Sequence, residues 1–322
     1  MTQLSASDAI PVTVPTKPGE PEAVFIGGVP RSGTTLMRTV LQKHSRIAIA
    51  DENHFMGHML PRLGVRHDLR RFGDLHDDAN VRRFVAHLYG PFMEGSRLRE
   101  VSPYWRWLTM RVPREEVEAR ILRGERSERG VFTALLRTYA DRRSRAIYGE
   151  KTPAHVRWAG ELLDWYPTAR FIQMIRDPRA VYRSEVKRRR AHAVTFPYRY
   201  VVRVPLLLRA FCLAEVCWAW IDAVHRHRAL TRAYPDRYRL VRFEDLVATP
   251  ETEIPAICAF LGVPFVPRML EQEVVSQGDR QGEAGFDAGA ADRWRSQVTA
   301  GEIRWIARLL GARLDEMGYP RA

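Results

Sequence analysis

The residues best suited to chemistry stand in the segment GVPRSGTTL, residues 28–36, directly after a short apolar run. Gly28, Gly33 and Thr35 have the spacing of a phosphate-binding loop, in which a strand runs through a glycine-rich turn into a helix. Such a loop aims backbone N–H groups and the positive end of a helix dipole at an anion. Thr34 stands in place of the usual lysine and Arg31 lies inside the loop. These departures disfavour a γ-phosphate on Mg²⁺ and favour a nucleotide 5′-phosphate that carries another group.

The side chains of this loop add ligands for the same anion. Gly33 lets the backbone approach the anion closely, and the hydroxyls of Ser32, Thr34 and Thr35 are hydrogen-bond donors. Arg31 adds a forked cation, which pairs well with phosphate oxygens. The alternative interpretation is a tight strand-to-helix turn with incidental hydroxyls.

A second strand end carries the run RDPRAVYRS, residues 176–184. Asp177 is a good helix N-cap and Pro178 a good first helical residue, so a helix is predicted to begin here. In a parallel sheet both runs lie at carboxyl ends of strands, where such folds bind ligands. Arg176 and Ser184 are then placed to grip a second phosphate. Alternatively, Arg176 pairs with Asp177 or a surface carboxylate, and the basic run 187–190 is a solvated helix face.

Two anion sites, without a lysine in the loop or an obvious Mg²⁺ carboxylate, indicate a nucleotide with two separate phosphate groups. The motifs PRSGTTL, RDPRAVYRS and VRFEDLV, in this order, resemble the motif set of sulfotransferases that use 3′-phosphoadenylyl sulfate (PAPS). The resemblance covers residues 23–318. It implies a P-loop-like α/β fold, no metal, and transfer of a sulfuryl group to a hydroxyl or amine. Adenosine 3′,5′-bisphosphate (PAP) would be the second product.

The resemblance also assigns nucleotide-binding residues. The first motif would hold the 5′-phosphosulfate with Arg31, Ser32, Gly33, Thr34, Thr35 and Leu36. The second motif would hold the 3′-phosphate with Arg176 and Ser184, followed one turn later by Arg188. Phe243 is expected near the adenine. In many family members a basic residue beside a tryptophan contacts the nucleotide, which here resembles Arg293 and Trp294.

The run HSRIAIADENHF, residues 44–55, resembles the tyrosylprotein sulfotransferase branch, in which a glutamate after the second strand removes the acceptor proton. By its distance from the loop, Glu52 takes this role, with Asp51 and His54 as rivals. The segment GEKTP resembles the place of a catalytic lysine, here Lys151. The alternatives are a capping role for Asp51, a surface position for Glu52, and a surface contact between Lys151 and Glu150.

The chemistry of sulfuryl transfer needs these residue types. A hydroxyl attacks sulfur in line with the departing phosphate, and a positioned carboxylate that takes the proton contributes about 10²–10⁴-fold. Negative charge builds on the leaving phosphate, where Lys151, Arg31 and the loop amides would stabilise it without a metal. The same logic of positioning and charge neutralisation governs phosphoryl transfer.

The elements that must position these residues alternate along the chain. Strands are predicted at 23–28, 47–50, 146–149, 170–175 and 238–243, and helices at 34–44, 131–143, 155–166, 178–190, 207–233, 250–261 and 299–317. Loops are predicted at 191–206 and 276–292. The alternation predicts an α/β, P-loop-like fold with a central parallel sheet flanked by helices on both faces. We expect a disordered lead-in over residues 1–20 and a single sulfotransferase domain over 21–322.

Composition limits the partners. The chain has 322 residues and a net charge of +13, with lysine only at positions 17, 43, 151 and 187, so the excess charge is arginine. A basic balance suits an anionic ligand, a nucleic acid or a membrane surface. No nucleic-acid-binding motif is present. Charged residues interrupt the apolar stretch 204–224, which therefore predicts a mostly buried helix rather than stable membrane insertion.

Three cysteines without a C-x-x-C pair, and a polar N-terminus without a signal-peptide pattern, favour a reducing cytoplasm and no structural zinc. A small molecule or glycoconjugate is therefore the favoured acceptor. Residues 53–130 and 190–215 are expected to line its site, with an aromatic wall drawn from Tyr104, Trp105, Trp107, Phe196 and Tyr198. The rival functions are a P-loop kinase or NTPase, a peptidyl-tyrosine sulfotransferase, and a nucleic-acid-binding protein. The sequence leaves the oligomeric state open, a homodimer included.

Overall fold

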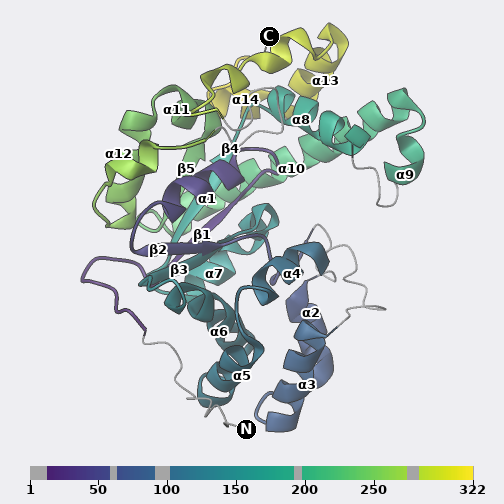
Figure 1. Ribbon diagram of the computed structural model, residues 1–322. Coiled ribbons are helices and arrows are strands. Elements are labelled where there is room, and N and C mark those ends of the chain that lie inside the picture. Colours follow the sequence, from purple (N-terminus) through teal and green to yellow (C-terminus); the bar gives the residue numbers. More distant parts are fainter. Residues whose placement is uncertain (1–12, 59–63, 91–101, 192–197, 274–282, 322) are drawn as a thin grey trace. The chain divides into compact units, whose positions relative to one another are not determined.

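The protein is described by a computed structural model that covers residues 13–58, 64–90, 102–191, 198–273 and 283–321 (Figure 1). Its five strands form one sheet in the order β2-β3-β1-β4-β5. They are β1 (Ala23–Gly28), β2 (Ile47–Ala50), β3 (Ile147–Lys151), β4 (Arg170–Ile175) and β5 (Tyr238–Arg242). The predicted α/β fold, a central parallel sheet flanked by helices, is confirmed. The alternation of short buried strands and helices along the chain is what requires it.

The chain divides into two compact units. The first contains residues 1–24 and 45–150, and the second contains residues 25–44 and 151–322. The sequence predicted one domain with a lead-in up to residue 20. Within the first unit, Thr13 donates a hydrogen bond to Asp141 and Arg46 pairs with Glu20, so the described part of that lead-in has specific partners.

In the first unit β2 and β3 pair in parallel, with Ile47 opposite Ile147 and Ala50 opposite Glu150. The strand β3 continues two residues beyond the predicted end, so Glu150 and Lys151 belong to the strand itself. The helix α6 packs against β2 and is buried over most of its length. The helices of this unit are α2 (Val65–Leu69), α3 (Asp78–Tyr89), α4 (Ser102–Thr109), α5 (Arg114–Arg123) and α6 (Glu128–Asp141), with a 3₁₀ turn at Arg70–Phe72.

In the second unit β4 and β5 pair in parallel, with Phe171 opposite Tyr238 and Ile175 opposite Arg242. Its α-helices are α1 (Thr34–Gln42), α7 (Ala159–Trp165), α8 (Pro178–Ala191), α9 (Tyr198–Val201), α10 (Pro205–Ala233), α11 (Phe243–Ala248), α12 (Pro250–Leu261), α13 (Ala300–Leu310) and α14 (Ala312–Glu316). The 3₁₀ helices are η3 (Pro153–Trp158), η4 (Pro267–Leu270), η5 (Ala288–Ala290) and η6 (Arg293–Ser296).

Several elements differ from the predictions in more than their end residues. The predicted helix at 155–166 divides into η3 and α7, and the one at 299–317 breaks at Gly311, whose φ of 55° cannot continue a helix. Thr299 begins α13 through a reciprocal capping box with Glu302. The strand β5 ends one residue early, so Phe243 begins α11. The short helix α9 lies where a loop was predicted.

The core of the second unit anchors the functional segments. Trp220 of α10 is fully buried among residues of α8, α10 and the C-terminal helices. Its indole Nε1 donates to the backbone oxygen of Arg176 at 3.0 Å. The long, apolar helix α10 therefore fixes the end of β4, from which the side chain of Arg176 extends.

Candidate active site

Hydrogen bonds hold the loop after β1 in one conformation. Ser32 is fully buried, and its hydroxyl donates toward the carbonyl oxygens of Val29 at 2.5 Å and Met174 at 3.1 Å. The backbone N–H of Val29 also donates to the oxygen of Met174, at 3.4 Å. The loop is thus attached to β4. In this structure the Ser32 hydroxyl serves the loop itself, and its contact with an anion stays a prediction.

Two glycines of the loop cannot carry a side chain. A Cβ on Gly28, where φ is 137°, would lie 2.1 Å from the oxygen of Met174. A Cβ on Gly33, where φ is 89°, would lie 2.5 Å from the ring of Phe243. Gly33 is also the residue before α1, so its left-handed backbone turns the chain into the helix. The first N–H groups of a helix have no acceptor within the helix, so α1 presents the amides of residues 34–36 to an anion.

The structure joins the two sequence motifs at Arg31. Its backbone is left-handed, with φ of 69°, a conformation that non-glycine residues adopt at some cost and often at functional sites. Its Nε donates to the hydroxyl of Ser184 on α8 at 3.1 Å, across 153 positions of sequence. Arg176 Nη1 donates to the backbone oxygen of Arg31 at 3.3 Å. The predicted 5′-phosphosulfate and 3′-phosphate residues therefore meet in one place.

Arg176 is held by neutral groups rather than by a carboxylate. Its Nη2 donates to the oxygen of Ala290 at 2.6 Å, and its guanidinium lies 4.0 Å from the ring centre of Phe243. Its buried Nε has no hydrogen-bond partner among the described residues. The alternative pairing with Asp177 is wrong, because that carboxylate binds Arg179 at 2.6 Å and caps the start of α8.

Positive charge gathers around Arg176. Burial and the nearby charges of Arg31, Arg183 and Arg293 lower the pKa of the Arg176 guanidinium to about 10. Glu244 opposes them in part, but burial raises the pKa of its carboxyl, which accepts hydrogen bonds from the Asp177 backbone N–H and the Tyr319 hydroxyl. An anion bound among these guanidinium groups would relieve their mutual repulsion.

Two members of this cluster were missed by the sequence reasoning. Arg183 directly precedes the predicted Ser184, and its Nε donates to the side-chain oxygen of Gln297. Glu244, the glutamate of the RFEDL run, connects the start of α8 to the C-terminal segment. Both stand inside the motifs that were quoted, so their motif position was the available signal.

Arg293 and Trp294, which the sequence predicted to contact the nucleotide together, have different surroundings in the structure. Trp294 is buried, with the guanidinium of Arg179 4.2 Å from its ring centre and that of Arg295 4.8 Å away. Its ring therefore belongs to the core and supports Arg179. Arg293 pairs with Asp287 and adds to the charge around Arg176. Nucleotide contacts by Arg293 and Trp294 stay predictions.

The remaining nucleotide residues have varied surroundings. Thr34 and Leu36 are buried at the start of α1, whereas Thr35 between them is exposed. Arg188 forms an ion pair with Glu185, which lies one turn before it on α8, with its Nε 2.9 Å from the carboxylate. Because that carboxylate already neutralises Arg188, we expect a weaker contribution from it than from Arg176.

Lys151 is buried at the end of β3. The backbone N–H of the next residue, Thr152, donates to the oxygen of Ile26 at 3.1 Å, so the start of this segment is fixed against β1 within the second unit. The alternative of a surface contact between Lys151 and Glu150 is wrong, because both side chains are buried.

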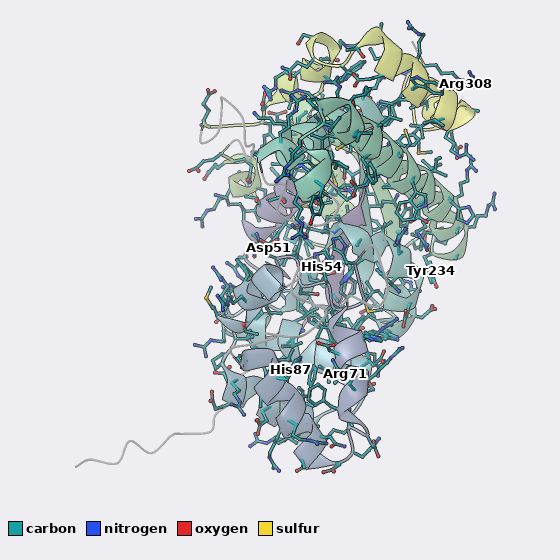
Figure 2. All side chains as sticks on the ribbon, turned by 90° about the vertical axis from the view of Figure 1, so that its right-hand side faces the viewer. Asp51, His54, Arg71, His87, Tyr234 and Arg308 are labelled. Carbon is teal, nitrogen blue, oxygen red and sulfur yellow. The ribbon has the colours of Figure 1, made fainter. Side chains whose placement is uncertain are left out.

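The three rival bases lie together after β2 in the first unit, where Figure 2 labels Asp51 and His54. The Glu52 carboxylate is 20% exposed and lies 3.5 Å from Nε2 of His54. The side chain of Asp51 accepts a hydrogen bond from the backbone N–H of Glu52 at 2.9 Å, which is a local capping role. His54 is buried and has a left-handed backbone, with φ of 50°. Their motif neighbours Lys151 and Arg31 belong to the second unit.

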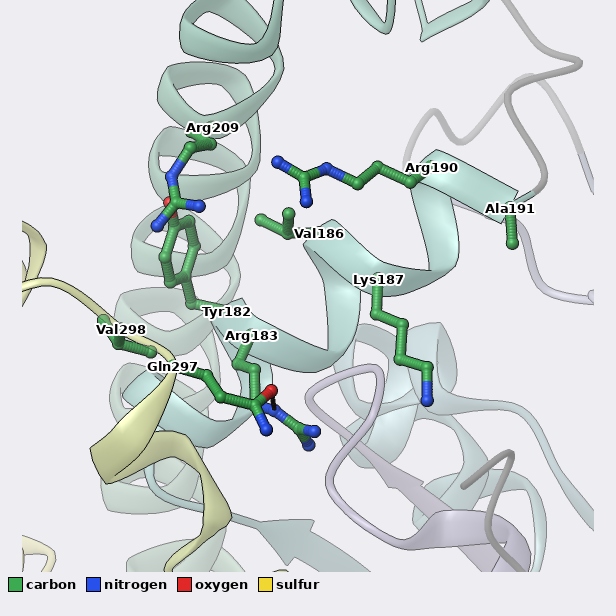
Figure 3. Close-up of a pocket in the computed structure, with 9 residues that line it drawn as sticks. All are labelled: Tyr182, Arg183, Val186, Lys187, Arg190, Ala191, Arg209, Gln297 and Val298. Carbon is green, nitrogen blue, oxygen red and sulfur yellow. Dashed lines mark hydrogen bonds between the residues drawn. The ribbon is translucent and has the colours of Figure 1, made fainter. Parts of the chain in front are cut away.

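A basic pocket of about 460 Å³ opens on α8 (Figure 3). Figure 3 shows the Arg190 guanidinium extending over Val186 toward Arg209. Glu302 balances the charge of Arg209 through a close ion pair. The pocket is lined by Tyr182, Arg183, Val186, Lys187, Arg190, Ala191, Arg209, Gln297 and Val298. Four of these residues are cationic and none is acidic, so the pocket favours an anionic group.

Of the predicted aromatic wall, only Trp107 has a described side chain. It lies on α4, with its ring centre 5.4 Å from that of Tyr139 and the guanidinium of Arg111 above it. Phe196 and the side chains of Tyr104, Trp105 and Tyr198 lie outside the described residues.

Other chemistries find little support in the described part of the chain. Its His, Cys, Asp and Glu side chains form no group of three suited to a metal ion. Burial raises the pKa of the Cys212 and Cys217 thiols to about 12 and that of Cys258 to about 11, so they are poor nucleophiles. Among the helices described, α10 included, none has the length and apolar character needed to cross a bilayer.

Comparison with known proteins places this site in a family. The model of the sulfotransferase family matches residues 21–267, which include the loop after β1 and the segment at the end of β4. The chain therefore belongs to the sulfotransferase family.

The relatives of the chain include protein-tyrosine sulfotransferases and carbohydrate sulfotransferases. The chain is 25% identical to a protein-tyrosine sulfotransferase of Drosophila melanogaster, over 92% of this chain and 51% of that protein. It is 30% identical to carbohydrate sulfotransferase 5 of Mus musculus, over 47% of this chain and 41% of that protein. The chain thus spans about half the length of these curated relatives or less.

Among solved structures, the fold is similar to the sulfotransferase domain of the Synechococcus PCC 7002 olefin synthase. The TM-score is 0.52 and the identity 22%, over 94% of this chain and 96% of that domain. The sulfotransferase domain of the curacin biosynthetic pathway gives the same TM-score at 20% identity, over 93% of this chain and 98% of that domain. These likenesses support the fold.

Proposed function

We propose that this protein transfers the sulfuryl group of PAPS to a hydroxyl of a small molecule or glycoconjugate. The observation that carries the proposal is the meeting of Arg31, Ser184 and Arg176, which joins the loop after β1 to the helix after β4. A single anion would need only one of these segments. Two joined segments, each with its own cation, suit a nucleotide that has a phosphate at both its 5′ and 3′ positions.

In this proposal the amides of residues 34–36 and the side chain of Arg31 bind the 5′-phosphosulfate. Arg176 and Ser184 bind the 3′-phosphate, and the stacked Phe243 lies toward the adenine. The lowered pKa of Arg176 supports this arrangement, because buried like charges make the ligand-free site electrostatically costly. A doubly phosphorylated nucleotide offsets that cost with charge-assisted hydrogen bonds.

The proposed reaction needs a base and a charge stabiliser. The acceptor oxygen bonds to sulfur while the bond from sulfur to the phosphate oxygen breaks, and PAP leaves with the electron pair. Glu52 takes the acceptor proton, and Nε2 of His54 lies 3.5 Å from its carboxylate. Lys151 and Arg31 stabilise the negative charge on the departing phosphate. The assignments of Glu52 and Lys151 rest on their motif positions.

The test of this proposal uses the purified chain with PAPS and a set of hydroxyl acceptors. We expect PAP release that depends on the acceptor, and calorimetric binding of PAP without added metal. Turnover of ATP with Mg²⁺, together with the absence of heat on adding PAP, would favour the rival kinase or NTPase. A peptide with a central tyrosine belongs in the acceptor set, because one named relative is a protein-tyrosine sulfotransferase.

The basic pocket on α8 supports an acceptor that carries an acidic group. Arg190 is exposed and forms no ion pair among the described residues, so its charge is available to such a group. We predict that Arg190→Ala lowers the preference for an acidic glycan over its carboxyl-reduced form about two- to five-fold, the range of an exposed ion pair. The measurement is the ratio of the two kcat/KM values.

The matched control for this prediction is Arg308→Ala. Arg308 is an exposed arginine of α13 that does not line the pocket, so its removal should leave the ratio unchanged. If the kcat/KM ratio falls equally in both variants, the preference for the acidic glycan depends on the net charge of the protein and not on the pocket. No change in either variant would remove the pocket from acceptor recognition.

A further inference from the structure

The peptide group between Arg176 and Asp177 lies between two regular elements of the second unit. The register of β4 with β5 ends at Ile175, and α8 begins at Pro178. Buried backbone N–H and C=O groups need hydrogen-bond partners, which outside sheets and helices come from side chains or water. The side chain of Arg176 extends from this point, so the partners of this peptide group also set the direction of the guanidinium.

Two side chains from distant parts of the sequence bind this peptide group. Trp220 Nε1 donates to the backbone oxygen of Arg176 at 3.0 Å, and the backbone N–H of Asp177 donates to Oε1 of Glu244 at 2.9 Å. Trp220 belongs to α10 and Glu244 to α11. The C=O and the N–H of one peptide group are thus held by two different helices. We call Trp220 and Glu244 the peptide clamp.

Tyr319, which follows α14, contacts both members of the peptide clamp. Its hydroxyl donates to Oε2 of Glu244 at 2.8 Å, whereas the Asp177 N–H uses Oε1. Its ring lies edge-on to the indole of Trp220, with ring centres 6.1 Å apart and planes inclined by 65°. Tyr319 is 3% exposed. One buried side chain therefore touches both groups that hold the peptide after Arg176.

Further contacts fix Tyr319 in this position. Its backbone N–H donates to the oxygen of Leu314 in α14 at 2.9 Å. The guanidinium of Arg242 lies 4.7 Å from the ring centre, and Nη2 of the same arginine donates to the oxygen of Gly318 at 3.2 Å. A group orients its neighbours precisely only when packing and hydrogen bonds hold the group itself. Tyr319 meets this condition from several sides.

The Tyr319 hydroxyl also acts on the charge of Glu244. Burial raises the pKa of the Glu244 carboxyl, whereas the hydrogen bonds from Asp177 and Tyr319 and the charge of Arg176 oppose that rise. A hydrogen bond to the ionised form favours that form. An ionised carboxylate accepts hydrogen bonds on both oxygens, but protonation turns one oxygen into a donor. The Tyr319 hydroxyl therefore helps to keep Glu244 an acceptor for the Asp177 N–H.

We propose that Tyr319 is a positioning residue for recognition of the 3′-phosphate. It orients Glu244 and Trp220, and these two hold the peptide group from which Arg176 extends. The inference rests on the function proposed above, in which Arg176 binds that phosphate. Tyr319 acts through Arg176 and touches no nucleotide itself. A tyrosine that only stabilised the core would change the affinities for all nucleotides by one factor.

The first test compares Tyr319→Phe with the unmodified chain by isothermal titration calorimetry with PAP and adenosine 5′-phosphate. The variant keeps the ring beside Trp220 and loses only the hydroxyl. We expect the affinity for PAP to fall about three- to ten-fold, which is part of the factor that a hydrogen bond to a charged group contributes. Adenosine 5′-phosphate has no 3′-phosphate, so its affinity should stay nearly unchanged. The ratio of the two affinities therefore falls.

The matched control is Tyr234→Phe. The Tyr234 hydroxyl also donates to a carboxylate at 2.8 Å, that of Asp164 on α7, within the same unit. Neither residue belongs to the peptide clamp or to the proposed nucleotide site, so this variant should leave both affinities unchanged. Thermal unfolding of the two variants measures the loss of stability that each hydroxyl causes.

The second test asks whether Tyr319 acts through Arg176. The Arg176→Ala variant has no guanidinium to position, so adding Tyr319→Phe to it should lower the affinity for PAP little or not at all. Residues that act independently give additive losses, whereas a residue that acts through another does not. A merely structural tyrosine would cause the same loss with and without the Arg176 side chain.

The outcomes separate this inference from the function on which it rests. If the unmodified chain binds neither nucleotide, the proposed function fails and the role of Tyr319 falls with it. If the unmodified chain binds PAP and Tyr319→Phe leaves the affinity ratio unchanged, the function stands and the inference is wrong. The inference is also wrong if Tyr234→Phe lowers the ratio equally, or if the losses from Tyr319→Phe and Arg176→Ala are additive.

Discussion

Arg176→Ala is expected to weaken the binding of PAP about 10²-fold, because charge-assisted hydrogen bonds to a phosphate contribute ~1.5–3 kcal/mol. Affinity for adenosine 5′-phosphate, which lacks the 3′-phosphate, should change only a few-fold. Arg176 also donates to the backbone oxygens of Arg31 and Ala290, so the variant loosens the loop for both nucleotides. Isothermal titration calorimetry with the two nucleotides separates these contributions.

The control for this experiment is Arg188→Ala. Arg188 lies one turn beyond Ser184 and already forms an ion pair with Glu185, so we expect a change of less than about five-fold for PAP. Arg176→Lys keeps the charge without the fork and should fall between the two. If Arg176→Ala lowers the affinity for PAP and for adenosine 5′-phosphate by the same factor, Arg176 supports the loop and does not bind the 3′-phosphate.

Glu52→Gln is expected to lower kcat by about 10²–10⁴-fold, the usual contribution of a general base, with the Kd for PAP unchanged. The amide keeps the size and the hydrogen-bonding oxygen of the carboxylate but has almost no basicity. Turnover is measured as PAP release at saturating PAPS, once an acceptor has been found by the screen described above.

Asp51→Asn distinguishes the rival bases. Its side-chain oxygen still accepts the hydrogen bond from the Glu52 backbone N–H, so we expect kcat to stay within a few-fold of the unmodified value. His54→Gln removes the neighbour of Glu52 and is expected to have an intermediate effect. If Glu52→Gln turns over normally while Asp51→Asn does not, the base is Asp51.

The local elements could be predicted because their causes are local. The strands β1, β2 and β4 and the helix α12 have the bounds expected from apolar runs and from proline at a helix start. Asp177 caps α8 as predicted, because an aspartate before proline satisfies backbone N–H groups nearby. Both anion-binding segments were therefore found from short stretches of sequence.

The assignments that failed depend on distant neighbours. Arg176 was given a carboxylate as its alternative partner, but backbone oxygens from the loop and from η5 take that place. Lys151 was given a surface contact as its alternative, but β3 runs through it and buries it. The two oxygens that bind Arg176 lie 145 and 114 positions away from it in sequence, so no short pattern contains them.

The sequence by itself determined the order of strands and helices, the glycine-rich loop, the second basic run and the family resemblance. Only the tertiary structure decided that Arg31 reaches Ser184, that four arginines gather around one strand end, and that Lys151 is buried at the end of β3. The physical reason is that backbone conformation and helix capping depend on residues a few positions apart. Burial, charge crowding and exposure depend on segments that chain folding brings together from more than a hundred residues away.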